Sequence, residues 1–245
     1  MAGVELSHLS KQFVLGQQVL EAVQDVTATI APGSFTVIVG KSGCGKTTLL
    51  RLLGGLEEKT TGQIHWTDVE NQQITPKIGF VFQEPRLMPW LTVFENTAFS
   101  VDKFLTPTAV ESIVNPILQL LGLETFRAAY PTQLSGGMAQ RVALGRTLCY
   151  DPDLILMDEP FGALDYFTRK KMQREMVDLF MTQKKTLIFV THDVTEAIYL
   201  GQKILVMDAG KIIREIPVEM PYPRDSTTTT FLRVQQEILE VLGGF

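Results

Sequence analysis

The chain has 245 residues, of which 45% are hydrophobic and 20% charged, a composition typical of a folded protein with a sizeable core. Acidic residues outnumber basic residues by 27 to 22, and the net charge of −5 argues against sequence-independent binding of nucleic acid, which needs clustered positive charge. The two cysteines have no spacing that suggests a metal site or a disulfide framework, which favours a reducing compartment.

The N-terminal third reads as short strands on either side of a glycine-rich turn. Residues 35–39, "FTVIV", form a continuous apolar run bounded by glycine, which is typical of a strand buried on both faces. The pattern becomes helical from Lys46 and closes at Gly54 and Gly55. Further short strands are predicted at residues 4–13, 23–30, 61–66 and 77–82.

Between about residues 89 and 150 the strand signals disappear and helical patterns replace them. Pro107 stands near one helix start, with Thr106 or Thr108 as the expected cap. Strands resume at residues 153–157, 186–190 and 203–207, followed by a hairpin around Ala209 and Gly210. This order predicts an α/β sheet core interrupted by a helical insertion near residues 87–150.

A final helix is predicted after the threonine run at residues 227–230. Phe231, Val234, Ile238 and Val241 share one face of this helix. Core packing is the favoured interpretation of that face, and a surface for a partner is the alternative.

A glycine-rich loop between the buried strand and the first helix is the clearest functional signal. "GKSGCGKTT" fits the pattern G-x-x-x-x-G-K-[ST], in which inward-pointing N–H groups and a helix N-terminus favour phosphate groups. Lys46 can reach the β- and γ-phosphates, and the Thr47 hydroxyl can ligate Mg²⁺. A glycine-rich turn without a ligand is the alternative. The predicted ATP-binding residues of this loop are Gly40, Lys41, Ser42, Gly43, Cys44, Gly45, Lys46, Thr47 and Thr48.

Three polar residues follow two other predicted buried strands. Asp158 ends the run "LILMD" and is the expected carboxylate for Mg²⁺, while Glu159 is the candidate to polarise an attacking water. A solvated strand end is the alternative for this acidic pair. His192 follows "TLIFVT", where it predicts a hydrogen bond to the γ-phosphate, although a lone histidine there is more often structural.

These residues, together with "LSGGMAQR" at residues 134–141, resemble the ATP-binding subunits of ABC transporters over nearly the whole chain. The resemblance rests on the phosphate loop, Gln83 in "VFQEPRLMPW", the 134–141 signature, "LILMDEP", "GALD" and "VTHD", in the family's order. It implies a P-loop NTPase α/β fold with a mixed, largely parallel sheet, an N-terminal antiparallel β region and an inserted helical subdomain. One ATPase domain, 1–245, is expected, with core segments 1–86 and 151–215, helical subdomain 87–150 and tail 216–245.

The resemblance also implies that two such subunits bind ATP head to tail, so that the signature of one completes the phosphate-loop site of the other. Ser135, Gly136 and Gly137 would then donate hydrogen bonds to a γ-phosphate held by the partner, and a hydroxyl and N–H groups at a helix start suit that role. The signature helix is expected from about Gly137, burying a stripe of residues: Met138, Val142, Gly145 and Cys149. Asp165 should lie at the dimer interface.

Gln83 is implied near the Mg²⁺ and the water, as a catalytic and metal-site residue at the hinge to the helical subdomain. Phe13 stands where the family usually places an aromatic ring on adenine, and internal packing of this ring is the rival interpretation. The chain departs from the family pattern at Ser34, where glutamate is common, and at Gly145, where alanine is common. A glycine there softens its helix by about 1 kcal/mol relative to alanine.

"FQEPRLMPWLTVFENTAF" and "THDVTEAIYL" resemble the branch of ABC importers that handles nitrate, sulfonates, taurine and bicarbonate. This implies a second ATPase subunit, integral membrane permeases and, indirectly, a solute-binding protein as partners. The first ten residues do not form a signal peptide, and no run of 18 apolar residues could span a bilayer, so a peripheral position on the cytoplasmic face of the membrane is expected. The apolar stretch 85–90 is the predicted groove for a permease helix, with internal packing as the alternative for Leu87 and Met88. A soluble regulatory ATPase with a protein partner is the alternative function.

Overall fold

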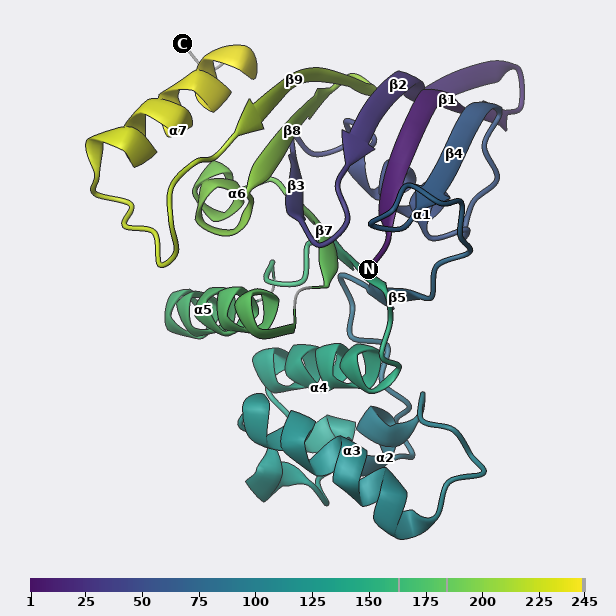
Figure 1. Cartoon of the computed structure of the whole chain (residues 1–245), viewed down its shortest axis with the longest axis vertical. Helices are drawn as coiled ribbons and strands as arrows, with labels where there is room; N and C mark the ends of the chain where they lie inside the picture. The colour runs from purple at the N-terminus through teal and green to yellow at the C-terminus, as the bar shows by residue number, and fades with distance from the viewer. Residues whose placement is uncertain (163, 184, 244–245) are drawn as a thin grey trace.

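The computed structural model describes residues 1–162, 164–183 and 185–243, so Ala163 of the "GALD" motif lies outside the described residues. Two sheets occupy one end of the molecule and a group of helices the other (Figure 1). The strands are β1 (Gly3–Leu15), β2 (Gln18–Ile30), β3 (Phe35–Val39), β4 (Thr61–Thr67), β5 (Ile78–Val81), β6 (Leu154–Asp158), β7 (Thr186–Thr191), β8 (Lys203–Asp208) and β9 (Lys211–Pro217). The helices are α1 (Lys46–Leu53), α2 (Val93–Ala98), α3 (Pro107–Leu120), α4 (Gly136–Cys149), α5 (Tyr166–Gln183), α6 (Val194–Leu200) and α7 (Thr229–Val241), with short 3₁₀ turns at Glu124–Phe126 and Pro131–Gln133.

The larger sheet has the order β5-β6-β7-β3-β8-β9, and only the β8–β9 pair is antiparallel. Every residue of β3, β6 and β7 is buried, as the apolar runs predict for strands covered on both faces. Because these three strands are parallel neighbours, their carboxyl ends meet at one edge of the sheet. The phosphate loop, Asp158 and His192 therefore come together there, although 152 residues separate the first from the last.

The smaller sheet, β2-β1-β4, is antiparallel throughout, as the N-terminal region predicts. Its strands are longer than predicted, since β1 and β2 each have 13 residues and the β1–β2 pairing contains register shifts. Leu6 and Leu9 of β1 are buried in the same apolar cluster as Leu49 and Leu50 of α1. This second core fixes the first helix, and with it the phosphate loop, between the two sheets.

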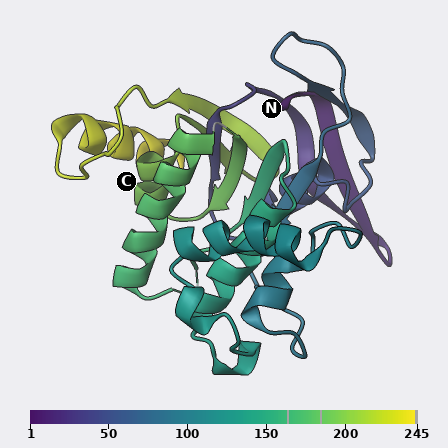
Figure 2. The same ribbon diagram turned by 60° about the horizontal axis from the view of Figure 1, so that its bottom comes forward.

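Helices α2, α3 and α4 form the opposite end of the molecule, which comes forward in Figure 2. Thr106 caps α3 with Pro107 at its first position, which confirms that part of the sequence prediction. Val142, Gly145 and Cys149 of α4 are buried, whereas Met138 is only half-buried. A Cβ on Gly145 would lie 3.1 Å from a Leu121 methyl carbon, so the glycine permits close packing of α4 on its neighbours.

The C-terminal helix α7 packs against α6. Phe231, Val234 and Ile238 are buried in the main apolar cluster, which confirms core packing for this face, and Val241 lies half-buried at its edge. Arg224, 6% exposed, donates from Nη1 to the carbonyl oxygens of Ile198 and Gly201 and thereby fastens the tail to the end of α6. Within residues 1–162, 164–183 and 185–243, none of the helices combines the length and apolar character needed to cross a bilayer.

Candidate functional site

The phosphate loop joins β3 to α1 and depends on glycine at its last turn. Gly45 caps α1 with a φ of 104°, and a Cβ there would stand 2.1 Å from the carbonyl oxygen of Ala22. Neither the dihedral angle nor the space admits a side chain. The close approach of β2 thus holds the start of the helix, where backbone N–H groups are suited to bind an anion.

Lys46 is 4% exposed, and its Nζ donates to the carbonyl oxygens of Gly40 and Lys41, each at 2.9 Å. The same ammonium lies 4.0 Å from Oε1 of Glu159. The loop therefore curls around its own lysine, and the lysine connects the loop to the acidic residue at the end of β6.

A cleft of about 610 Å³ opens beside the loop. It contains residues that the sequence interpretation missed, from β2 and from the β8–β9 turn. Gly210 of that turn donates its N–H to the Cys44 carbonyl at 2.9 Å, so the hairpin supports the loop. The hairpin itself was predictable, but its position beside the loop depends on the order of strands in the sheet. The cleft is lined by Phe13, Leu20, Glu21, Ala22, Gln24, Ser42, Gly43, Cys44, Gly45, Lys46, Thr47, Thr48, Gln83, Glu159, Ala209 and Gly210.

Cys44 is buried in this wall of the cleft, and burial raises the pKa of its thiol. A raised pKa lowers the thiolate fraction at neutral pH, so the geometry gives this cysteine a packing role in the loop.

Thr47 lines the cleft, and its hydroxyl donates to Oδ1 of the neighbouring Asp158 at 2.8 Å. Asp158 is 5% exposed, and burial raises the pKa of its carboxyl group. A cation would offset that cost of burying the charge. Across the described ranges, no group of three or more His, Cys, Asp or Glu side chains could hold a metal by itself. Two protein oxygens beside a phosphate loop suit Mg²⁺, which keeps waters and substrate phosphates among its ligands.

Glu159 and His192 form a pair across the ends of β6 and β7. The Glu159 backbone has a φ of 40°, and its N–H donates to the Val190 carbonyl at 3.0 Å. This left-handed turn, rare for residues other than glycine, accompanies a side chain that is 17% exposed and lines the cleft. Oε2 of Glu159 lies 2.9 Å from Nδ1 of His192.

Gln83 follows β5 and lines the same cleft from the side of the helical end. The Phe82 carbonyl just before it accepts a hydrogen bond of 3.0 Å from Nε2 of Gln140, a buried residue of α4. Gln140 was not singled out in the sequence, although it lies within the signature stretch. It ties the segment of Gln83 to the signature helix.

Phe13 of β1 lies half-buried at the wall of the cleft, with the Lys11 ammonium 4.7 Å from its ring centroid. This position fits a ring available to a planar base more than a ring packed in the interior. Stacking on adenine stays a prediction.

The signature lies elsewhere on the surface. Ser135 caps α4 by accepting from the Met138 N–H, and both Ser135 and Gly136 are exposed. A Cβ on Gly137 would meet Cγ2 of Thr168 at 2.8 Å, so α4 packs closely on the start of α5. Asp165, exposed at that start, accepts from the Thr168 N–H at 3.0 Å. Of the four residues Ser135, Gly136, Gly137 and Asp165, none lines the cleft of its own chain.

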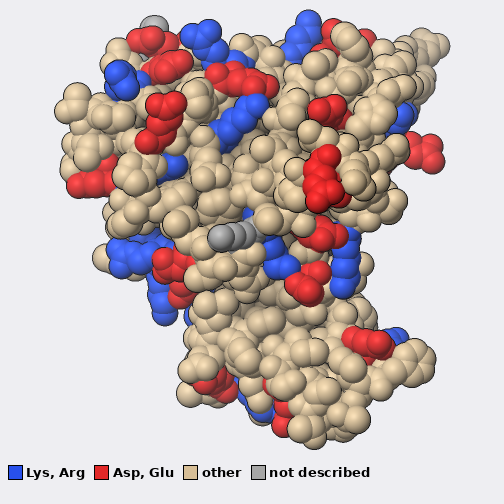
Figure 3. Space-filling view, in the orientation of Figure 1, with Lys and Arg blue, Asp and Glu red and all other residues tan. Residues whose placement is uncertain are grey.

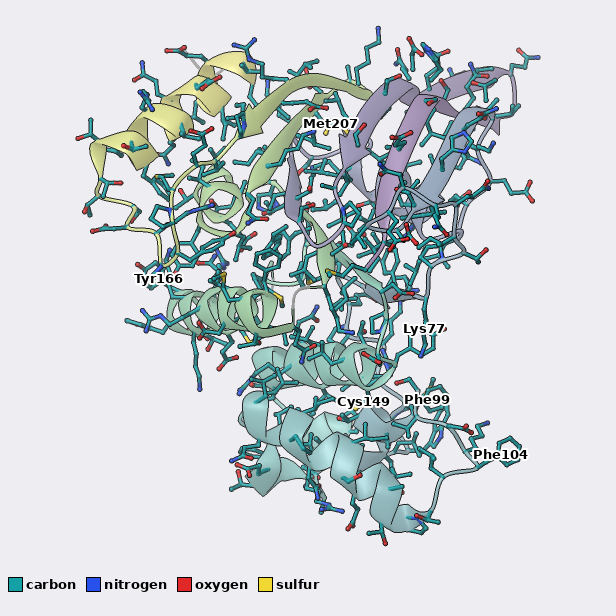
Figure 4. The ribbon with its side chains drawn as sticks, viewed as in Figure 1. Lys77, Phe99, Phe104, Cys149, Tyr166 and Met207 are labelled. Carbon is teal, nitrogen blue, oxygen red and sulfur yellow. The ribbon has the colours of Figure 1, made fainter. Side chains whose placement is uncertain are left out.

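Lysine, arginine and acidic side chains are interspersed over the face shown in Figure 3. Aromatic side chains are exposed at the helical end, where Phe104 projects outward from the loop between α2 and α3 (Figure 4). Phe104 is 97% exposed and Trp90, which precedes α2, is 69% exposed.

The family model described as ABC transporter matches residues 23–162. The chain is 40% identical over 242 residues to the aliphatic sulfonates import ATP-binding protein SsuB of Bacillus cereus, covering 97% of this chain and 94% of that protein. It is 42% identical over 222 residues to the aliphatic sulfonates import ATP-binding protein SsuB 2 of Pseudomonas syringae pv. tomato, covering 90% of this chain and 91% of that protein. A dimeric, post-hydrolysis structure of the ATP-binding cassette MJ0796, bound to ADP and Pi, matches with a TM-score of 0.79 at 32% identity, covering 89% of this chain and 100% of that one.

Proposed function

This chain belongs to the ABC transporter family and is an ATP-binding subunit that hydrolyses ATP, and from this premise we propose that it drives the import of a small sulfonate through a membrane permease. The observation that carries the hydrolytic part is the convergence of Lys46, Asp158 and Glu159 at one edge of the parallel sheet. The sulfonate class rests on the similarity to the two aliphatic sulfonate import proteins.

The chemistry is divided among side chains at that edge. Lys46 and the N–H groups of the loop would hold the phosphates, while Thr47, Asp158 and Gln83 would hold Mg²⁺, which when bound would supply positive charge against the phosphates. Glu159 polarises the attacking water as general base. His192, whose Nδ1 lies 2.9 Å from Glu159, orients that carboxylate, and when both of its ring nitrogens are protonated its Nε2 would donate toward the γ-phosphate. Phe13 stacks on the adenine.

The signature acts on a second copy of the chain or a close homologue. Ser135, Gly136 and Gly137 present a hydroxyl and N–H groups at the start of α4, and Asp165 lies beside them. Two observations support this: these residues are outside their own chain's cleft, and the MJ0796 cassette is a dimer in its post-hydrolysis state. The proposed cassette is one domain, with core segments 1–86 and 151–215, helical subdomain 87–150 and tail 216–245.

We propose that the permease contact lies at residues 85–90, between the nucleotide core and the helical end. Leu87 packs against the main core, which leaves Pro89 and Trp90 as the exposed apolar members of the stretch. A permease helix seated there would sense movement of Gln83, which lies seven positions before Trp90. The chain would then sit at the cytoplasmic face of the membrane, with a solute-binding protein acting on the permease. The relatives' names favour this importer over a soluble regulatory ATPase.

The test is to purify a tagged chain from detergent-solubilised membranes of its own cell and identify co-purifying proteins by mass spectrometry. A polytopic permease is expected, and the complex in liposomes should hydrolyse ATP faster with an alkanesulfonate and its binding protein than with nitrate or bicarbonate. Recovery with only a soluble partner would overturn the transporter assignment. Trp90→Ala should reduce permease recovery, whereas Leu232→Ala, which removes an apolar side chain that is 51% exposed on α7, should not.

A further inference from the structure

We infer that Glu196, a buried carboxylate of α6 outside the assigned nucleotide site, is a positioning residue that couples helix α5 to His192. The inference rests on the roles proposed above for His192 and Glu159. It concerns how His192 is aligned with Glu159. If it holds, the position of α5 affects the hydrolysis rate, and α5 starts next to Asp165, which we propose faces the partner.

Both neighbours of His192 are held by a single hydroxyl group. Thr191, 2% exposed, accepts the Asp193 N–H on its Oγ1 at 3.0 Å. The Thr191 hydroxyl then donates to Oε2 of Glu196. Asp193 in turn caps α6 by accepting the Glu196 N–H at 3.1 Å. The backbone that carries His192 is therefore fixed on both sides by contacts that converge on Glu196.

The other oxygen of this carboxylate reaches a different element. Oε1 of Glu196 accepts from Nε2 of Gln173 on α5 at 3.0 Å, and Gln173 is 2% exposed. Glu196 is itself 5% exposed, and burial raises the pKa of its carboxyl group while the Thr191 and Gln173 hydrogen bonds lower it. A carboxylate that accepts from two elements at such depth acts as a rigid link between them.

The link borders the reacting residues. A small cavity of about 40 Å³ has Glu159, His192, Arg169 of α5 and Glu196 among its lining residues. The Arg169 guanidinium donates to the Leu164 carbonyl at 3.0 Å, just before Asp165. A shift of α5 at its start is thus transmitted to Glu196, then through Thr191 to His192, and changes the 2.9 Å contact with Glu159.

The discriminating experiment compares Glu196→Met with Glu196→Gln in the purified full chain. Both changes remove the charge and keep the side-chain length. Only the glutamine can still accept a hydrogen bond from the Thr191 hydroxyl. Its NH₂ group can also donate to the amide oxygen of Gln173 once the Gln173 amide has rotated. For Glu196→Met we expect kcat to fall about tenfold or more with KM for ATP unchanged, because misplacing a reacting group by about 1 Å can cost about 100-fold. Glu196→Gln should recover most of that loss. Equal losses in the two variants would overturn the inference.

Thr191→Val, which removes the donor with little change in shape, provides a second test should Glu196→Met fold poorly. It should lower kcat as Glu196→Met does, and in a His192→Ala background neither change should lower the residual rate further. Full additivity with His192→Ala, or a loss explained by weaker ATP binding or a lower Tm, would refute the positioning role. The His192→Ala single variant separates the proposed role of His192 from the proposed role of Glu196. If His192→Ala keeps wild-type activity, the role of His192 is refuted. If His192→Ala loses activity while Glu196→Met stays active, only the coupling through Glu196 is refuted.

Discussion

Arg146 of α4 holds the segment that we propose as the permease contact, and replacing it should loosen that segment selectively. Its Nη1 donates to the Arg86 carbonyl and its Nη2 to the Pro85 carbonyl, each at 3.0 Å. Burial lowers the pKa of the Arg146 guanidinium, although the group stays charged at neutral pH. Arg86 itself has a φ of 47°, so the turn adopts a backbone conformation that needs outside support.

The size of the effect follows from these two contacts. Hydrogen bonds to a charged group contribute about 1.5–3 kcal/mol each, and one of these two is exposed, which places the loss in Arg146→Met near about 2–3 kcal/mol for opening of the segment. Local opening should then become about 30- to 150-fold more frequent, since about 1.4 kcal/mol corresponds to tenfold.

Hydrogen–deuterium exchange of the amides at residues 83–91 measures this opening directly. We expect faster exchange there in Arg146→Met, unchanged exchange in β3 and β7, and weaker recovery of the permease. Arg233→Met, on the exposed face of α7, is the matched control. Unchanged exchange at residues 83–91 in a folded Arg146→Met protein would show that the guanidinium does not hold the segment.

Three further outcomes are expected. Glu159→Gln should bind ATP but not hydrolyse it. In sedimentation it should be a dimer with Mg-ATP and a monomer with ADP. A monomer with both nucleotides would count against the head-to-tail arrangement, unless the permease is needed for pairing. Because burial raises the pKa of Asp158, the folded state binds the proton of this carboxyl group more tightly than the unfolded state does. The stabilisation from that proton is present at low pH and is lost as pH rises through the raised pKa. Asp158→Asn should therefore raise Tm more at about pH 8 than near pH 3.8, the ordinary pKa of aspartate, while abolishing Mg²⁺-dependent hydrolysis, and a pH-independent difference in Tm would contradict the electrostatic cause. Phe13→Ala should weaken ATP binding by about tenfold, since stacking contributes about 1–3 kcal/mol, and should leave binding of inorganic triphosphate unchanged; a parallel loss for both ligands in calorimetry would exclude stacking.

The sequence was sufficient wherever function is tied to the ends of buried strands. The continuous apolar character of runs such as residues 35–39 and 153–157 predicts central strands. Polar residues directly after such parallel strands must lie at the same edge of the sheet. This is why the phosphate loop and Asp158 could be brought together from the sequence. The cap of α3 was narrowed to Thr106 or Thr108 for the same kind of reason, because threonine beside Pro107 is a local signal, and the structure has Thr106 there.

Contacts between distant elements could not be predicted, because their geometry depends on packing. Gln173 and Glu196 lie 23 residues apart on different helices, and the sequence contains nothing that aims one at the other. Met138 illustrates the same limit, since a regular spacing predicts its face but not how far the neighbouring helices extend over it. Gly145 was interpreted from helix propensity alone, whereas the structure adds the close packing of Leu121.

The packing of Gly137 on Thr168 has a genetic consequence. Because this contact joins the signature to the segment of Asp165, we expect the two to move together. In the head-to-tail dimer that we propose, each composite site would draw its phosphate loop from one copy and both of these segments from the other. Two alleles that are inactive alone, one altered at Lys46 and the other at Gly137, would therefore complement each other when co-expressed. Their mixed dimers would carry one fully wild-type site and one doubly defective site.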